Sequence, residues 1–500
     1  MATEAAAGEQ LPHEPGAVVP APPDPTPARR KPEGPAIGAS PVEAAPGGSQ
    51  SLVRAAPPRT PAEIAGAIHA MEERLAATPR RSHPLQHATA AYRLGLAYAE
   101  SPNGDRSQNL RRAIACYELA TDVFDPRFDP VEHARALNAA GAARRELGDL
   151  RGAAELFERA AELFEGRDRD TELAAGLNNL GLARAELGEV VDAMAAYDRA
   201  AGTFDPESDE GRRGLALTLY NRGQACASSD TVDGLADALD DYAQALGHID
   251  PAQNPYHYAL IHQGIGIAEL GLAGLQPEQR SERLARAVTA FEEALGVFSR
   301  TAFPFQHALT KYNLGLAWSA MGAELELRLA MACFEDVVSV LDPRVQPAPW
   351  RRAYASLTRV EAELGGRHPG WTLADHYVAL LAEATPSKRT DLLRERLARL
   401  LALPDASRDA ALIEMDASVF KLPASDARAV VGSELSAVME LPNDAQEAVV
   451  RGLMDVRNRL GPEARDAADL VLDGAVGDAL DGPQRILVRD FMYSMGFVRP

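Results

Sequence analysis

Cysteine, lysine and long apolar runs are scarce in this sequence of 500 residues. Its three cysteines, Cys116, Cys226 and Cys333, are too few and too far apart for a disulfide framework or a thiolate zinc site. No stretch reaches the roughly 18 uninterrupted apolar residues of a membrane helix, and the first 20 residues lack the basic and apolar regions of a secretory signal. We therefore expect a soluble, cytoplasmic protein without a membrane partner.

Basic residues are outnumbered by acidic residues, 51 to 72, and the formal net charge at pH 7 is −21. A chain of this charge is repelled by nucleic-acid phosphates, so we expect no nucleic-acid partner. All but four of the basic residues are arginine, which is typical of a high-GC genome rather than of a phosphate-binding surface. The four lysines are Lys31, Lys311, Lys388 and Lys421.

The beginning of the chain has the composition of a disordered tail. Proline, alanine and glycine make up 34 of the first 62 residues, and no aromatic residue is present. Such a segment cannot bury enough apolar surface to offset the entropy of ordering, so residues 1–59 are predicted to be disordered. Order is predicted to begin at Thr60, because Thr60, Pro61 and Glu63 have the spacing of a helix-capping box, and the helix is expected to end near Ala77.

Six glycines, 40 to 49 residues apart, indicate an internal repeat. They are Gly95, Gly141, Gly181, Gly223, Gly266 and Gly315. An alanine precedes each of them by seven residues, and each is followed by Ala-x3-aromatic-x2-Ala, with valine as the last residue in the sixth copy. The aromatic residues are Tyr117, Phe157, Tyr197, Tyr242, Phe291 and Phe334. Spacings of 4 and 3 place a large residue between two small ones on one helix face, so each unit is predicted to be a helical hairpin.

These motifs resemble the tetratricopeptide repeat, most closely in the copy that runs from Leu177 through Gly181 and Gly188 to Tyr197. The copies exceed the usual ~34 residues of that family, as in its long-repeat bacterial type. The resemblance implies an all-α, right-handed superhelical α-solenoid over residues 60–401, with an N-terminal capping helix, six repeats and a degenerate seventh that opens at Pro349. It also implies that the first helices of the repeats line a groove for a peptide or protein.

Residues 402–500 have a different periodicity, with prolines 19 to 21 residues apart. Proline is tolerated at the start of a helix and not inside it, so about five short helices are predicted. The prolines are Pro404, Pro423, Pro442, Pro462 and Pro483. This portion is either a helical cap that closes the array or a separate partner-binding module.

A stripe of the first helix, at positions −6, −3, +1 and +4 from each glycine, is the candidate binding surface. At −3 all six residues are aromatic or amide and none is charged: Tyr92, Asn138, Asn178, Tyr220, Gln263 and Tyr312. Such side chains stack on, or hydrogen-bond to, a peptide without a fixed charge. The only basic residues of the stripe are Arg135 and Arg145, so no paired clamp for a carboxylate is expected. We predict that these eight residues bind a partner; the alternative is that the stripe packs between helices.

No phosphate-binding loop, nucleophile elbow or metal-binding helix motif is present in the sequence. His87, His133 and His307 share one repeat position, which indicates a structural role at helix starts rather than a metal site. We therefore expect a non-enzymatic adaptor or scaffold that needs no cofactor or metal. One alternative is a regulatory or chaperone-like subunit inhibited by its own tail or C-terminal module. The other is an enzyme with a site at the C-terminal junction, near Trp371, Asp375 and His376.

Overall fold

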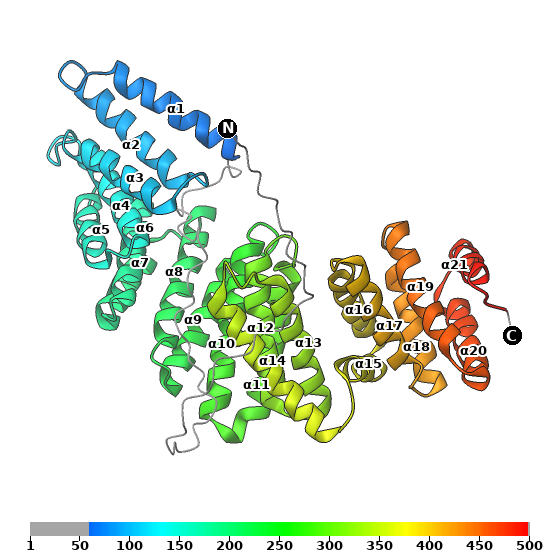
Figure 1. Ribbon diagram of the computed structural model, residues 1–500. Helices are drawn as coiled ribbons and strands as arrows, with labels where there is room; N and C mark the ends of the chain where they lie inside the picture. The colour runs from blue at the N-terminus through cyan, green and yellow to red at the C-terminus, as the bar shows by residue number, and fades with distance from the viewer. Residues whose placement is uncertain (1–59, 499–500) are drawn as a thin grey trace, which may run out of the picture. The chain divides into compact units, whose positions relative to one another are not determined.

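The computed structural model describes residues 60–498, and these residues form 21 α-helices, one short 3-10 helix and no strand (Figure 1). The predicted disordered tail, residues 1–59, lies outside the described part of the chain. None of the helices between Thr60 and Val498 is long and apolar enough to cross a membrane. The described part of the chain is therefore all-α, as the sequence predicts.

The first helix, α1 (Pro61–Ala77), begins at the predicted capping box. The backbone N–H of Glu63 donates to the Thr60 hydroxyl at 3.3 Å, and the backbone N–H of Thr60 donates to the Glu63 carboxylate at 2.7 Å. Two backbone donors at the helix start are thereby satisfied by side chains.

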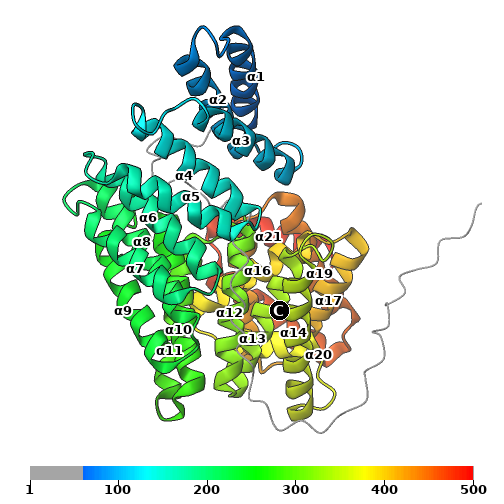
Figure 2. The same cartoon turned by 90° about the vertical axis from the view of Figure 1, so that its left-hand side faces the viewer.

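Six helical hairpins follow α1, and in each the helix with the repeat glycine packs against the helix with the repeat aromatic residue. The first helices are α2 (Pro84–Glu100), α4 (Pro130–Glu146), α6 (Asp170–Glu186), α8 (Asp209–Ala227), α10 (Pro255–Leu275) and α12 (Pro304–Met321). The second helices are α3 (Arg106–Thr121), α5 (Leu150–Phe164), α7 (Val190–Thr203), α9 (Val232–His248), α11 (Arg280–Val297) and α13 (Glu324–Val340). Each second helix also packs against the next first helix, so the hairpins form a repeat array (Figure 2).

The repeat glycines and the repeat aromatic rings are in direct contact within every hairpin. A Cβ atom at Gly95, Gly181 or Gly266 would lie 2.5 Å from the ring of the same repeat, and at the other three glycines 2.7 or 2.8 Å. The six rings are at most 1% exposed, and the alanines seven residues before the glycines are fully buried. Each ring therefore occupies the space that a side chain on the first helix would need.

The hairpin pattern ends at α14 (Pro347–Arg367), which packs against α13. Val360 lies seven residues after the buried Ala353, at the position where the six repeats have glycine. A buried isopropyl group therefore replaces the glycine on which a ring packs in the six hairpins. The next helix, α15 (Leu373–Glu383), packs instead against α13 and α17 (Asp405–Val419).

From α15 onward, the most extensive contacts are between helices two apart in the chain, from α15 with α17 to α19 with α21. The helices thus form two rows, one of α15, α17, α19 (Asn443–Arg459) and α21 (Gly482–Ser494), and the other of α16 (Pro386–Leu401), α18 (Ala424–Val438) and α20 (Pro462–Ala479). Residues 402–498 contain five helices, α17 to α21, and the five regularly spaced prolines stand at their starts. One continuous apolar cluster extends from α13 to α21, which joins the rows to the array.

The contact between Gly181 and Tyr197 predicts a large effect of a small substitution. Gly181→Ala is expected to lower the free energy of unfolding by about 2 kcal/mol, because the added methyl group overlaps the buried ring. Gly202→Ala, on the helix of Tyr197, is the control: nothing lies within 4 Å of its Cβ position, so it is expected to be neutral or to stabilise by about 0.5 kcal/mol. Urea denaturation followed by circular dichroism measures both, and equal stability of the two variants would contradict the prediction.

Candidate functional site

The six predicted residues at position −3 lie on the first helices α2, α4, α6, α8, α10 and α12, one on each. Asn178 and Gln263 are buried, the other four are half-buried, and none is exposed. The structure therefore places these residues in equivalent positions of successive hairpins, with limited access to solvent.

The amide side chains of this set link neighbouring first helices. The Asn221 amide donates to the side-chain oxygen of Asn178 at 3.0 Å, from α8 to α6, and the Gln263 amide donates to the Thr310 hydroxyl at 2.8 Å, from α10 to α12. A longer bond of 3.4 Å joins Asn179 to Asn138. Part of the hydrogen-bonding capacity assigned to a partner is therefore used inside the array. The donors Asn179 and Asn221 stand at position −2 of repeats three and four, one residue after the −3 position. These two asparagines are the sequence signal that could have predicted the bonds between hairpins.

The three tyrosines of the set each contact the aromatic ring of their own repeat. The ring centroids of Tyr92 and Tyr117, of Tyr220 and Tyr242, and of Tyr312 and Phe334 lie 5.9, 5.8 and 5.7 Å apart, all in tilted geometry. Such pairs stabilise by about 1 kcal/mol beyond the area that they bury. The tyrosine rings therefore extend the hairpin core toward the stripe.

The tyrosine hydroxyls differ in their hydrogen bonding. The Tyr220 hydroxyl accepts a hydrogen bond from the Gln224 amide at 2.9 Å, whereas those of Tyr92 and Tyr312 have no hydrogen-bond partner within residues 60–498. Burial raises the pKa of Tyr92, so its hydroxyl keeps its proton at neutral pH. Tyr92 and Tyr312 thus present hydroxyl groups that lack a partner in this part of the chain, at two widely separated repeats.

The two predicted basic residues of the stripe are already paired with glutamates of the next repeat. The Arg135 guanidinium lies 2.6 Å from the Glu172 carboxylate, and the Arg145 guanidinium lies 2.6 Å from Glu186. Both pairs join α4 to α6 and are partly accessible to solvent, so each contributes at most about 1 kcal/mol to stability. Their charges are compensated within the array.

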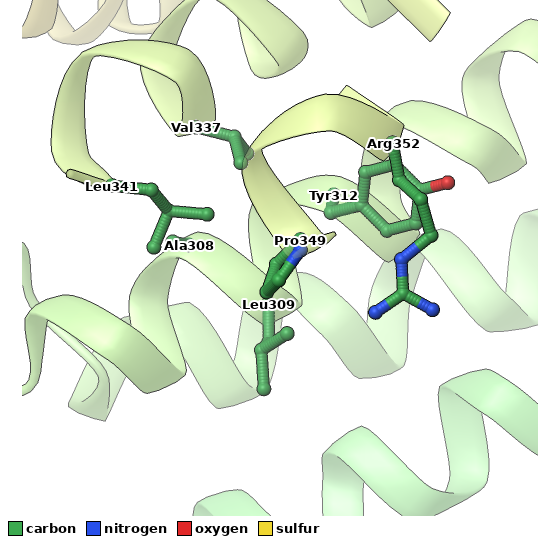
Figure 3. Close-up of a pocket in the computed structure, with 7 residues that line it drawn as sticks. All are labelled: Ala308, Leu309, Tyr312, Val337, Leu341, Pro349 and Arg352. Carbon is green, nitrogen blue, oxygen red and sulfur yellow. The ribbon is translucent and has the colours of Figure 1, made fainter. Parts of the chain in front are cut away.

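A small slot lies at the last hairpin, between α12, α13 and α14 (Figure 3). It is lined by Ala308, Leu309, Tyr312, Val337, Leu341, Pro349 and Arg352. Its free volume of about 20 Å³ accommodates one water molecule and no side chain. Arg352 is the one charged residue of the seven, so the stripe ends beside a guanidinium group.

The histidines that share one repeat position fix the starts of first helices. The Nδ1 atoms of His87, His133 and His307 lie 2.7, 2.6 and 2.9 Å from the carbonyl oxygen nine residues earlier, at the end of the preceding helix or in the turn after it. Because a carbonyl only accepts, Nδ1 bears the proton in each ring. This geometry is the structural role predicted from their position. In the part of the chain that the structure describes, no group of three or more His, Cys, Asp or Glu side chains is placed to hold a metal ion.

Asp375 and His376 at the C-terminal junction do not form a hydrogen-bonded pair. The Asp375 carboxylate accepts from the backbone of Thr372 at 2.9 Å and from Lys421 at 2.6 Å. The buried His376 ring lies 5.2 Å from Trp371, and neither of its nitrogens has a partner within the described residues. Burial lowers the pKa of His376, which keeps the ring neutral at pH 7. The carboxylate–imidazole contact that general acid–base catalysis uses is therefore not made here.

Two buried carboxyl groups lie in the core of the C-terminal rows, and the sequence analysis missed both. Asp416 on α17 and Glu434 on α18 are fully buried, and none of their four oxygens has a hydrogen-bond partner within the described residues. Burial, followed by the nearby Glu434, raises the pKa of Asp416 well above its usual range, and burial raises the pKa of Glu434 to about 8. Both groups are therefore protonated at neutral pH.

Comparison of the chain with protein-family models gives no matching family, and comparison with curated proteins gives no matching sequence.

The buried carboxyl groups predict stability that falls as the pH rises. A raised pKa in the folded state means that folding holds a proton that the unfolded chain releases near pH 4, so the stabilisation is complete below that pH and is lost as the pH rises toward 8. The loss is expected to be about 1.4 kcal/mol per pH unit for each group.

The double variant Asp416→Asn/Glu434→Gln tests this dependence, since it removes the ionisable protons and keeps the side-chain shapes. Melting temperatures measured from pH 5 to pH 9 should decline for the native protein and stay level for the variant, which becomes the more stable of the two at pH 9. Glu447→Gln, an exposed glutamate of α19, serves as the control and should follow the native protein. Parallel curves for the native protein and the double variant would disprove the assignment.

Proposed function

We propose that this protein is a non-enzymatic adaptor or scaffold whose array of hairpins binds a peptide or protein along the first helices. The observation that supports this proposal is the repeated set of uncharged aromatic and amide residues at position −3, half-buried in four of six repeats. A surface of this kind offers stacking area and neutral hydrogen bonds at regular spacing, which suits an extended or helical peptide.

The geometry of the hairpins supports assignment to the tetratricopeptide type. All six hairpins have an aromatic ring of the second helix packed on a glycine of the first helix, at the positions where the sequence resembles that family. This assignment implies a right-handed superhelix. It also implies that the proposed groove lies on the side of the first helices.

The charges of the stripe favour a partner with a neutral or apolar contact face. Arg135 and Arg145 have glutamate partners in the adjacent repeat, and replacing these contacts would cost desolvation energy on both sides. The stripe also becomes apolar toward its end, where Leu260, Leu309 and Leu316 are half-buried. An amphipathic helix that lays its apolar side on α10 and α12 fits this surface best.

The contacts of α16 favour a groove that the C-terminal rows leave open. Lys388 and Arg396 of α16 pair with Glu292 on α11 and Glu335 on α13, which are second helices. Glu395 pairs with Lys311 of α12, at position −4 and outside the stripe. These contacts support the adaptor over the alternative in which the C-terminal module inhibits the protein by filling its own groove.

Substitutions in the groove are expected to abolish capture of the partner. Tyr92→Ala and Tyr312→Ala, combined in one full-length chain, should reduce recovery of native binding proteins in affinity purification by about tenfold or more, because two anchoring rings and their hydroxyl donors are lost. Val191→Ala is the control, since Val191 on the second helix α7 is 83% exposed and should leave capture unchanged.

A second pair of measurements separates binding from folding. Circular dichroism and the melting temperature show whether the array of the double variant remains intact, and Tyr92→Phe/Tyr312→Phe keeps the rings while removing only the hydroxyls. Capture that persists in the folded Tyr→Ala variant, or that depends on Val191, would refute a binding site on the first helices.

A further inference from the structure

Helix α14 has fewer helix neighbours than the six first helices before it. Each first helix from α2 to α12 packs against the helix before it in the chain and against its own second helix. By contrast, α14 packs against α13 and contacts α12, while the helix that follows it, α15, packs against α13 and α17. In the described part of the chain, the side of α14 that faces away from α13 is therefore not covered by a helix.

The burial of equivalent positions shows which residues of α14 are uncovered. At positions −5 and +2 from the repeat glycine, all six first helices have a buried residue. Counted from Val360, which stands at the glycine position, the same positions of α14 are Ala355 and Ala362, and both are exposed. Arg359 at position −1 is also exposed, whereas no residue at position −1 of the six repeats is. Positions that the array covers in six first helices are thus open to solvent in α14.

The uncovered side of α14 is basic, although the net charge of the chain is −21. The segment from Pro343 to Val360 contains four arginines and no acidic residue. Three of these arginines, Arg351, Arg352 and Arg359, are exposed on α14, and none of the three has an ion pair within residues 60–498. A spacing of seven places Arg352 and Arg359 on one side of the helix, two turns apart.

Elsewhere in the array, second helices supply carboxylates to the arginines of first helices. Arg222 of α8 pairs with Asp241 on α9, and the guanidinium of Arg184 on α6 lies 3.8 Å from the carboxylate of Asp192 on α7. In both cases the carboxylate belongs to the second helix of the same hairpin. Since no second helix packs on α14 in residues 60–498, an acidic helix would complement it in both packing and charge.

An exposed aromatic ring borders the basic side of α14. Tyr354 is 52% exposed and stacks on Trp350, with ring centroids 5.1 Å apart and 7° between the ring planes. The indole N–H of Trp350 donates to the carbonyl oxygen of Val338 on α13 at 3.2 Å, which fixes the stacked pair. Between Tyr354 and the arginines the exposed residues are small, among them Ala355, so a second helix can approach α14 closely.

We call the surface formed by Arg351, Arg352, Tyr354, Ala355, Arg359 and Ala362 the α14 face. We propose that the α14 face binds an acidic, amphipathic helix of a partner protein, which packs on α14 as a second helix packs on its first helix. Carboxylates of this helix pair with the arginines, and its apolar residues pack on the tyrosine and the alanines. A nucleic acid fits less well, because a long polyanion would also meet the acidic remainder of the chain.

This inference adds a second partner surface to the proposed adaptor. It does not rest on binding along the stripe, because none of the six residues at position −3 belongs to the α14 face. Groove capture is measured with the Tyr92 and Tyr312 variants, so failure of either proposal can be recognised separately.

A fluorescently labelled peptide with the sequence of α9, Val232–His248, tests the α14 face. This peptide contains four aspartates and no lysine or arginine, and as α9 it already supplies a carboxylate to a first-helix arginine. Fluorescence anisotropy with the full-length chain is expected to show saturable binding with a Kd on the order of 10 μM. Arg352→Glu/Arg359→Glu should weaken binding about tenfold or more, because like charges then face each other.

Two controls test whether the charges of this face determine the binding. Arg151→Glu/Arg159→Glu makes the same change in charge at two exposed arginines of α5 and should bind the peptide like the native chain. The same peptide with asparagine in place of its four aspartates should bind about tenfold more weakly or not at all. Because the substituted arginines are exposed, the melting temperatures of both variants are expected to match that of the native chain.

Several results would overturn the proposal. They are a peptide that does not bind saturably, an asparagine peptide that binds equally well, an Arg352→Glu/Arg359→Glu variant with native affinity, and an α5 control that loses affinity to the same extent. An oligonucleotide that binds the α14 face more tightly than the peptide would assign the face to a nucleic acid. Self-association of the native chain that Arg352→Glu/Arg359→Glu abolishes would assign it to a second copy. Either result would also overturn the proposal.

Discussion

The packing of an aromatic ring against a glycine is the contact on which the array depends. In six hairpins the ring fills the volume that a side chain on the first helix would need. This contact fixes which face of the first helix turns toward its partner. It thereby also fixes the direction of the residues at position −3. The three tyrosines among them pack against the aromatic ring of their own repeat. The candidate binding surface is a geometric consequence of the hairpin.

Local and periodic features of the fold could be predicted from the sequence. The spacing of Gly181 and Tyr197 indicates that the two helices of a hairpin pack against each other at these residues. The capping box at Thr60 involves residues only three positions apart. Both depend on short-range geometry, and the spacing of glycine and ring recurs in all six hairpins. The hydrogen bond between Asn178 and Asn221 could not be predicted in this way, because it depends on how two successive hairpins are rotated against each other. The ion pairs of Arg135 and Arg145 are hidden from the sequence for the same reason, since their glutamates lie about 40 residues away in the chain.

The C-terminal rows were harder to predict than the array. Regular prolines indicate where helices start, and an amphipathic pattern indicates that one face is buried, but neither identifies the helix that buries it. The spacing of the prolines therefore does not predict that each helix packs against the helix two positions away in the chain instead of the next one. Asp416 and Glu434 were overlooked because an acidic residue in a helix is normally solvated, and only the packed neighbours reveal that these two are enclosed.

The end of the hairpin pattern at α14 has a consequence for how proteins of this architecture change in length. If one whole hairpin before α14 were duplicated, the added hairpin would have its own glycine and ring. It would also present to the hairpins on either side the same surfaces against which they already pack. The same insertion after α14 would separate α14 from α15, a helix that packs against α13 and α17 instead of completing a hairpin. A whole hairpin can therefore be added before Pro347 with contacts of the existing kind, whereas an insertion behind α14 would interrupt the apolar cluster that extends from α13 to α21.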